Sequence, residues 1–401
     1  MNRIEDRHGD QVVSGTYADG FEAVADEFVR NLTERGEVGA SAHAVVAGET
    51  VVDLWGGTRD RQGTLWDADT MVVTWSCTKG ATAICAHVLV DRGLLDLDAP
   101  VGDYWPEFAT NGKEQTTVRM MLDHSAGVAA LRAPVPAGGY ADWDLMCEML
   151  AAEEPWWEPG TRNGYHMLTF GWTVGELVRR VSGVSLGTFL REEVTGPLDA
   201  DFYIGLPAEL EPRVAASIAH RPSRGDKQSG YTKALLADRD GLQGKAWFNM
   251  GGFEANDPAA HAAEVGGGGG IGSARGLARM YAPLANSGEA LGVRLVAPEA
   301  VAVMSDVAVA THVDAMLMLP TRFGLGFMKS MDNRRNRFGD TDSAIIGRNG
   351  FGHVGAGGSI GFADPDHGLS FGYAMNRMGP GLLLNERGQS LVDATYASLG
   401  A

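Results

Sequence analysis

Cysteine, lysine and long apolar runs are scarce in this chain of 401 residues. Its three cysteines are too few for a disulfide framework, and no Cys/His cluster has the spacing of a zinc site. No apolar run reaches the roughly 18 residues that span a bilayer, and the polar N-terminus lacks the apolar segment of a signal peptide. We therefore expect a cytoplasmic protein with free thiols, no metal or other cofactor, and no membrane partner.

Positive charge is also in short supply: 33 basic residues face 51 acidic ones, which gives a formal net charge of −18. Such a surface repels phosphate backbones and anionic lipid, which argues against nucleic-acid partners. The length favours two subdomains, or one large domain with an inserted one. The composition leaves homo-oligomer formation open.

Strand patterns occur toward both ends of the chain, and helical patterns occur between them. Residues 38–58 alternate in polarity around a tight turn, which predicts a β-hairpin, and residues 351–375 predict two further strands joined by a turn. We expect an α+β fold, an α/β sandwich in which residues 1–100 and 265–401 build an antiparallel sheet flanked by helices. Residues 101–264 would form an inserted, mainly helical domain, with the active site in the cleft between the two. The helical patterns lie at 21–35, 76–91, 118–122, 143–152, 169–181 and 186–194.

Two other segments lack a clear period. The polar stretch Arg221–Lys245 predicts a surface excursion. The glycine run Gly266–Gly270 is typical of a flexible linker, but Ser273 follows it as the N-cap of an amphipathic helix. We therefore favour a tight turn near a functional site for the glycine run.

Two serines match the Gly-x-Ser-x-Gly elbow of α/β-hydrolases, Ser185 and Ser359. That elbow needs a strand before the serine and a helix after it. Helical patterns lie on both sides of Ser185, and a strand pattern follows Ser359. We therefore expect both serines to have turn or packing roles.

A third serine, Ser76, stands three residues ahead of Lys79. Chance alone gives about 0.3 such pairs in a chain of this composition, so the spacing is weak evidence by itself. On a helix the two side chains share a face, and the free N–H groups of the first turn favour an oxyanion. The alternative is an N-cap serine beside a solvated lysine.

Further segments extend this pair into a larger pattern. Tyr165, in a loop of the helical part, and a glycine-rich strand at 352–358 complete a set found in β-lactamases and penicillin-binding proteins. Residues 121–127 (MLDHSAG) and 157–176 look like segments of class C β-lactamase-like proteins. The chain therefore resembles the β-lactamase-fold serine hydrolases over most of its length. Within them it looks most like the family VIII carboxylesterases.

Two departures from the family pattern separate its branches. The Lys-Thr-Gly strand triad is His353-Val354-Gly355 here, so the lysine that contacts a β-lactam carboxylate is missing. The Tyr-x-Asn motif is Tyr165-His166-Met167, so its asparagine is missing too. Both losses argue against an efficient β-lactamase or cell-wall peptidase and are common in the esterase branch.

The resemblance implies an acyl-enzyme mechanism. Ser76 would attack an ester carbonyl, while Lys79 and Tyr165 would move the protons. The backbone N–H groups of Ser76 and Ala356 would form the oxyanion hole. Gly355 would let the strand pass close to the substrate.

The candidates for substrate contact are His353, Gly355, Trp157 and His124. His353 would line the pocket, or act as a general base paired with the serine; we favour the first. We expect His124 to be a satisfied buried histidine rather than a catalytic one. Trp157 would either border an acyl pocket or pack in the core, and Cys77 is expected to be a core thiol.

The function that the resemblance implies is hydrolysis of small, short-acyl carboxylic esters without a cofactor. Amide or β-lactam hydrolysis and acyl transfer share its first half-reaction and stay open. A non-enzymatic relic of the fold is disfavoured, because Ser76, Lys79 and Tyr165 are all present.

Overall fold

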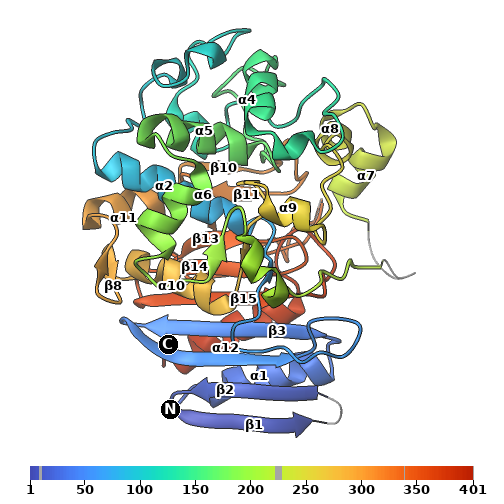
Figure 1. Ribbon diagram of the computed structural model, residues 1–401, viewed down its shortest axis with the longest axis vertical. Helices are drawn as coiled ribbons and strands as arrows, with labels where there is room; N and C mark the ends of the chain where they lie inside the picture. The colour runs from blue at the N-terminus through green and yellow to red at the C-terminus, as the bar shows by residue number, and fades with distance from the viewer. Residues whose placement is uncertain (9–10, 222–227, 338, 401) are drawn as a thin grey trace.

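The structure is a computed structural model that describes residues 1–8, 11–221, 228–337 and 339–400. Its centre is a ten-stranded sheet in which all neighbouring strands are antiparallel (Figure 1). From one edge to the other the strands are β1 (Asn2–His8), β2 (Gln11–Tyr17), β4 (Glu49–Gly57), β3 (Gly39–Val46), β15 (Leu369–Met375), β14 (Ile360–Asp364), β13 (Phe351–Val354), β12 (Met328–Lys329), β11 (Thr321–Phe323) and β10 (Val309–Thr311).

Both ends of the chain build this sheet, because β3 pairs with β15, with Ala40 opposite Met375 and Val46 opposite Leu369. The predicted antiparallel sheet made from both termini is confirmed. Two small sheets lie apart from it: β5 (Val72–Val73), β7 (Ile271–Gly272) and β6 (Phe202–Tyr203) form one, and β8 (Glu289–Ala290) with β9 (Val293–Arg294) form the other.

Helices cover both faces of the large sheet. On one face α10 (Ala274–Ala285) packs against β15, β14 and β3, and α2 (Cys77–Asp91) packs against β13. On the other, α1 (Glu22–Thr33) packs against β2, β4 and α12 (Glu386–Ser398). The alternation of side chains along β15 divides the two cores, because Tyr373 packs with the α12 side and Ala374 with the α10 side.

The remaining α-helices lie between residues 118 and 305, and α4, α5 and α8 are drawn above the labelled strands in Figure 1. They are α3 (Val118–Leu122), α4 (Trp143–Ala152), α5 (Phe170–Ser182), α6 (Leu186–Leu190), α7 (Gly230–Ala237), α8 (Leu242–Phe248), α9 (Pro258–Ala262) and α11 (Pro298–Ser305). None of the helices in the described residues is long and apolar enough to cross a membrane.

The helix α2 forms where the sequence is apolar on every side. Residues Cys77 to Leu89 are all buried, and the helix ends before Gly93, which has φ +68°. Cys77, Cys85 and Cys147 are free and buried, as expected.

Two segments differ from the sequence predictions. The N-terminal strands β1 and β2 were not predicted, because β1 is a charged edge strand with little hydrophobic alternation. The surface excursion predicted at Arg221–Lys245 contains α7 and part of α8, and Tyr231 and Leu235 of α7 are buried against the core. Residues 222–227 of this stretch lie outside the described part.

Candidate active site

Ser76 lies at a sharp junction between a strand and a helix. It follows β5 and precedes the first residue of α2. Its neighbour Trp75 has φ +51°, a left-handed conformation that a bulky residue rarely adopts and that concentrates at functional sites. The Ser76 hydroxyl makes no capping bond to the helix and is only half-buried. Ser76 therefore occupies the N-cap position of α2, but its side chain does not cap the helix as the alternative interpretation expected.

Lys79 is fully buried beneath Ser76. Its Nζ has three hydrogen-bond partners: Ser76 Oγ at 3.1 Å, the Met167 carbonyl at 2.5 Å and the Gly267 carbonyl at 2.6 Å. No carboxylate among the described residues pairs with it. Burial holds the pKa of the Lys79 ammonium well below its usual value. The alternative of a solvated lysine is wrong.

The glycine run Gly266–Gly270 packs tightly around Lys79. A Cβ on Gly267 would lie 2.3 Å from the Leu168 carbonyl oxygen, so the chain passes there only as glycine. The N–H of Gly270 donates to Thr78 Oγ1 at 2.8 Å. This segment is the predicted tight turn, and its Gly267 carbonyl bonds directly to Lys79.

Tyr165 lies on the other side of Lys79. The centroid of its ring is 4.5 Å from Lys79 Nζ, and its hydroxyl is 3.4 Å from His353 Nε2. Burial raises the pKa of the Tyr165 phenol well above its usual value, although a hydrogen bond with Ser76 acts in the opposite direction. The structure therefore brings Ser76, Lys79 and Tyr165 together, as the sequence predicted.

The tautomer of His353 follows from its contacts. Its Nδ1 lies 2.7 Å from the Val354 carbonyl, which can only accept, so Nδ1 carries the proton. Its Nε2 then presents a lone pair to the Tyr165 hydroxyl. Burial lowers the pKa of His353 to about 3, so the ring is neutral at ordinary pH.

The chain after β13 runs along the start of α2. A Cβ on Gly355 would lie 2.1 Å from the Thr74 carbonyl oxygen, which explains the glycine. Cys77 Sγ donates to the His353 carbonyl at 3.3 Å and ties the two segments together. Within the described ranges, the backbone N–H groups of Ser76 and Ala356 have no hydrogen-bond partner.

His124 and Trp157 lie behind the loop that carries Tyr165. His124 is buried with its ring centroid 4.9 Å from that of Tyr165; its Nδ1 accepts from the His166 N–H, but its Nε2 is unpartnered. Trp157 donates to the Ser125 carbonyl at 3.1 Å, and its ring lies against Gly164. Substrate contact by either residue stays a prediction.

The two elbow serines have other roles. Ser185 caps α6 and donates to Glu264 at 2.6 Å. Ser359 is fully buried in the turn before β14, and its Oγ has no hydrogen-bond partner. The turn and packing roles expected for them agree with these positions.

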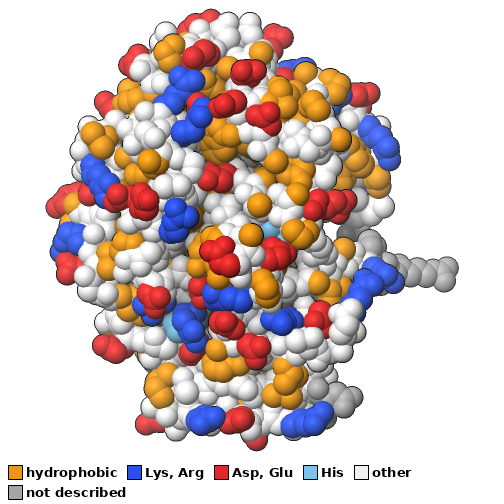
Figure 2. Space-filling model, in the orientation of Figure 1, with side chains coloured by type: hydrophobic (Ala, Val, Ile, Leu, Met, Phe, Trp, Pro, Cys, Tyr) orange, Lys and Arg blue, Asp and Glu red, His pale blue; other side chains and the backbone are white. Residues whose placement is uncertain are grey.

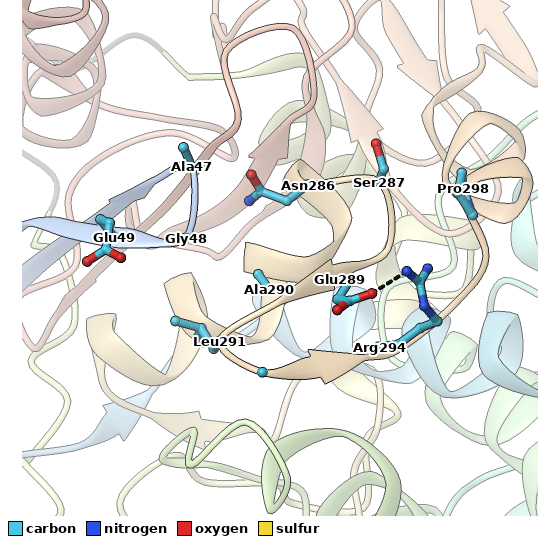
Figure 3. Close-up of a pocket in the computed structure, with 11 residues that line it drawn as sticks. Ala47, Gly48, Glu49, Asn286, Ser287, Glu289, Ala290, Leu291, Arg294 and Pro298 are labelled. Atoms are coloured by element: carbon cyan, nitrogen blue, oxygen red, sulfur yellow. Dashed lines mark hydrogen bonds and ion pairs between the residues drawn. The ribbon is translucent and has the colours of Figure 1, made fainter.

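A separate surface hollow of about 560 Å³ lies beside the β3–β4 turn and the end of α10 (Figure 3). Glu289 and Arg294 pair within it, and its lining includes none of Ser76, Lys79, Tyr165 or His353. Across the described residues, no group of three or more His, Cys, Asp or Glu side chains is arranged to hold a metal ion. The nucleophile and base candidates named from the sequence thus lie around Ser76 and not in this hollow.

Comparison with known proteins agrees with this geometry. The Beta-lactamase family matches residues 23–394. Esterase/beta-lactamase LipL of Mycobacterium tuberculosis (strain ATCC 25618 / H37Rv) is 36% identical over 381 residues, which are 89% of this chain and 81% of that protein.

Two solved structures extend the comparison. A family VIII carboxylesterase has a TM-score of 0.85 at 38% identity, covering 96% of this chain and 99% of its own. A penicillin-binding protein homolog from Caulobacter crescentus has a TM-score of 0.83 at 33% identity, with the same coverage of 96% and 99%. The predicted fold and family are confirmed: the chain belongs to the β-lactamase family and is a serine hydrolase with the β-lactamase/transpeptidase-like fold.

Proposed function

We propose that the protein is a carboxylesterase that hydrolyses small, short-acyl esters through an acyl-enzyme on Ser76. The observation that carries this proposal is the set of three partners around Lys79 Nζ. A neutral amine has two hydrogens and one lone pair. In the neutral form of Lys79, which burial favours, the carbonyls of Met167 and Gly267 take the two hydrogens, and the lone pair is directed at Ser76 Oγ.

The directions of two pKa shifts assign the base. An alternative pair, in which Tyr165 is a phenolate and Lys79 an ammonium, would need the tyrosine pKa lowered and the lysine pKa kept high. Burial shifts both in the opposite directions. Burial thus favours the neutral form of both groups, and we assign Lys79 as the general base.

In the first half-reaction Ser76 Oγ bonds to the ester carbonyl carbon, and its proton passes to Lys79. The backbone N–H groups of Ser76 and Ala356 stabilise the oxyanion, because both are free to donate. The carbon–oxygen bond to the alcohol then breaks. The Tyr165 hydroxyl gives its proton to that oxygen and recovers one from Lys79.

In the second half-reaction water attacks the acyl carbon and passes a proton back through Lys79 to Ser76 Oγ. This step releases the acid and restores the neutral pair. The account needs no metal or organic cofactor.

An uncharged substrate fits this site. Burial favours the neutral form of Lys79, and His353, at the place of the family's lysine, is neutral with its lone pair already facing Tyr165. Neither group offers a cation to a substrate carboxylate. The family VIII carboxylesterase supports the ester substrate class, whereas LipL is named both an esterase and a beta-lactamase, so β-lactam hydrolysis is the alternative to test.

The direct test compares p-nitrophenyl butyrate with a chromogenic cephalosporin, which carries a carboxylate. We expect kcat/KM for the ester to exceed that for the lactam by at least about 10²-fold, since the carboxylate would be buried without a partner. Equal or greater lactam turnover would favour a β-lactamase, and an inert ester would overturn the assignment.

The contact between Gly355 and Thr74 gives a second prediction. Gly355→Ala places a Cβ 2.1 Å from the Thr74 carbonyl oxygen, so the Ala356 N–H must move away from Ser76. We expect kcat to fall by roughly 10²–10³-fold, as when an oxyanion donor is lost. Gly368→Ala, at a turn with φ +57° between β14 and β15, is the matched control for glycine strain and should keep kcat. Equal losses in both variants would mean that general strain explains the effect.

A further inference from the structure

A buried carboxylate without a counter-charge lies behind Tyr165. Asp314, between β10 and β11, has no exposed surface. Its carboxylate forms no ion pair with any Lys, Arg or His in the described part of the chain, and burial and hydrogen bonds are the largest influences on its pKa. Burial of an unpaired carboxylate is unfavourable unless hydrogen bonds compensate it, so this residue needs an explanation.

The compensation comes from backbone N–H groups and one hydroxyl. Oδ1 accepts from the N–H groups of Met316 and Leu317, both at 2.8 Å, and from the N–H of Tyr165 at 3.0 Å. Oδ2 accepts from the same Tyr165 N–H at 3.1 Å and from the Thr321 hydroxyl at 3.5 Å. Burial raises the pKa of Asp314 to about 6 against these donors, so the group is ionised at pH 7.

The turn that carries Asp314 is attached at two further points. The Ala315 N–H donates to the Asn163 carbonyl at 3.0 Å, which is a second bond to the Tyr165 loop. From α8, Gln243 Nε2 donates to the carbonyls of Ala315 at 2.8 Å and Met316 at 3.1 Å. The turn is thus fixed between α8 and the loop that presents Tyr165.

The Tyr165 ring is restrained as well. It stacks on Phe323 at a centroid distance of 5.8 Å and lies 4.9 Å from the ring of His124. Its hydroxyl is already 3.4 Å from His353 Nε2, close to the limit of a hydrogen bond. A small shift of the Tyr165 backbone would therefore break that contact and move the hydroxyl relative to Ser76.

We propose that Asp314 is a positioning residue that acts through Tyr165. Its carboxylate holds the Tyr165 N–H so that the phenol stays within reach of Ser76, Lys79 and His353. A residue that only capped its own turn would need the bonds to Met316 and Leu317, but not the one to Tyr165, 149 positions away. The proposal rests on the proposed function, because the Tyr165 hydroxyl must take part in the reaction.

A double-mutant cycle tests it on the full chain. Asp314→Asn keeps the shape and can keep the bonds of Oδ1, but it replaces Oδ2 by an NH₂ group that faces the Tyr165 N–H, donor against donor. We expect kcat for p-nitrophenyl butyrate to fall by at least about tenfold with KM within about twofold, since only positioning is lost. In a Tyr165→Phe background the same change should cost less than about twofold, because the hydroxyl it positions is gone.

Glu176→Gln provides the matched control. Glu176 is also a fully buried carboxylate, but it bonds to Trp143, Arg179 and Arg180. Its replacement should lower the unfolding temperature and leave kcat unchanged. If Asp314→Asn does not fold, Gln243→Met is the second variant, because it removes the bonds from α8 to the same turn. Gln243→Met should lower kcat in the wild type but not in the Tyr165→Phe background.

The outcomes separate the two proposals. If Tyr165→Phe keeps full activity, the role of Tyr165 fails, and that of Asp314 fails with it. Suppose instead that Tyr165→Phe lowers kcat, and that Asp314→Asn lowers kcat by the same factor in the Tyr165→Phe background as in the wild type. Only the positioning role of Asp314 is then overturned. The positioning role is also overturned if Asp314→Asn folds and its kcat is unchanged. If Gln243→Met is used instead, the role is overturned when its kcat is unchanged, or when it lowers kcat by the same factor with and without Tyr165→Phe.

Discussion

Replacing Ser76 with alanine is expected to lower kcat/KM for p-nitrophenyl butyrate by roughly 10⁴–10⁶-fold, as the loss of a covalent nucleophile does in other serine hydrolases. The reason is local. Ser76 Oγ is the hydroxyl bonded to the buried Lys79 amine, at 3.1 Å. Ser76→Ala removes little volume at a half-buried position, so the unfolding temperature should change little. Initial rates and a thermal melt of the purified variant check both expectations.

Ser359→Ala is the matched control, because Ser359 matches the elbow pattern and also lies beside the 355–358 turn. Its Oγ is fully buried and has no hydrogen-bond partner, so its loss should leave the rate within about threefold of wild type. If Ser359→Ala is inactive and Ser76→Ala is active, Ser359 would be the nucleophile of a Gly-x-Ser-x-Gly elbow, and the present mechanism would be refuted.

The second large effect is expected at Lys79. Lys79→Met keeps most of the buried stem but removes the amine, and kcat should fall by roughly 10²–10⁴-fold, the usual contribution of a general base. Lys79→Arg keeps a cation that cannot act as a base near neutral pH. If positive charge were the essential property, the arginine variant would retain activity; we expect it to be as inactive as the methionine variant.

The pH profile of the wild-type enzyme tests the same role of Lys79, because it shows in which direction kcat/KM changes with pH. Only the neutral form of Lys79 can take the Ser76 proton, so kcat/KM should fall as the pH drops through the pKa of Lys79. Burial lowers that pKa well below its usual value, so activity should persist well below pH 10.5. An activity that rises only near pH 10 would contradict a buried neutral amine.

The sequence predicted the parts of the site whose signal is local. Ser76 and Lys79 are three residues apart on one helix, and Tyr165 and Gly355 lie in recognisable motifs, so all four could be named in advance. The antiparallel sheet and the α2 helix were predictable for the same reason. Alternating polarity indicates strands, a continuous apolar stretch indicates a buried helix, and both signals are local in the sequence.

The parts that could not be predicted depend on backbone groups and on distant partners. The carbonyls of Met167 and Gly267 orient Lys79, yet any residue type carries a carbonyl, so the sequence holds no signal for them. Asp314 bonds to N–H groups across 149 positions for the same reason. The positive φ of Trp75 is imposed by the tertiary structure, and no turn residue marks it.

The helices α7 and α8 were missed because both are short and the charged residues 238–240 separate them. Tyr231 and Leu235 are spaced as on one helical face and are buried, while charged and exposed side chains separate them from Leu242 and Ala246. The space-filling view shows acidic, basic and apolar side chains intermixed over this face of the molecule (Figure 2). Short helices of this kind are fixed by packing more than by propensity.

The most direct test of the central claim is to map the residue that becomes covalently modified. The protein is treated with a fluorophosphonate, digested, and its peptides are sequenced by mass spectrometry. We expect a single adduct on Ser76, whose formation is slowed by Lys79→Met and unaffected by Ser359→Ala. An adduct on another serine, or rapid ester turnover without any adduct on Ser76, would contradict the account.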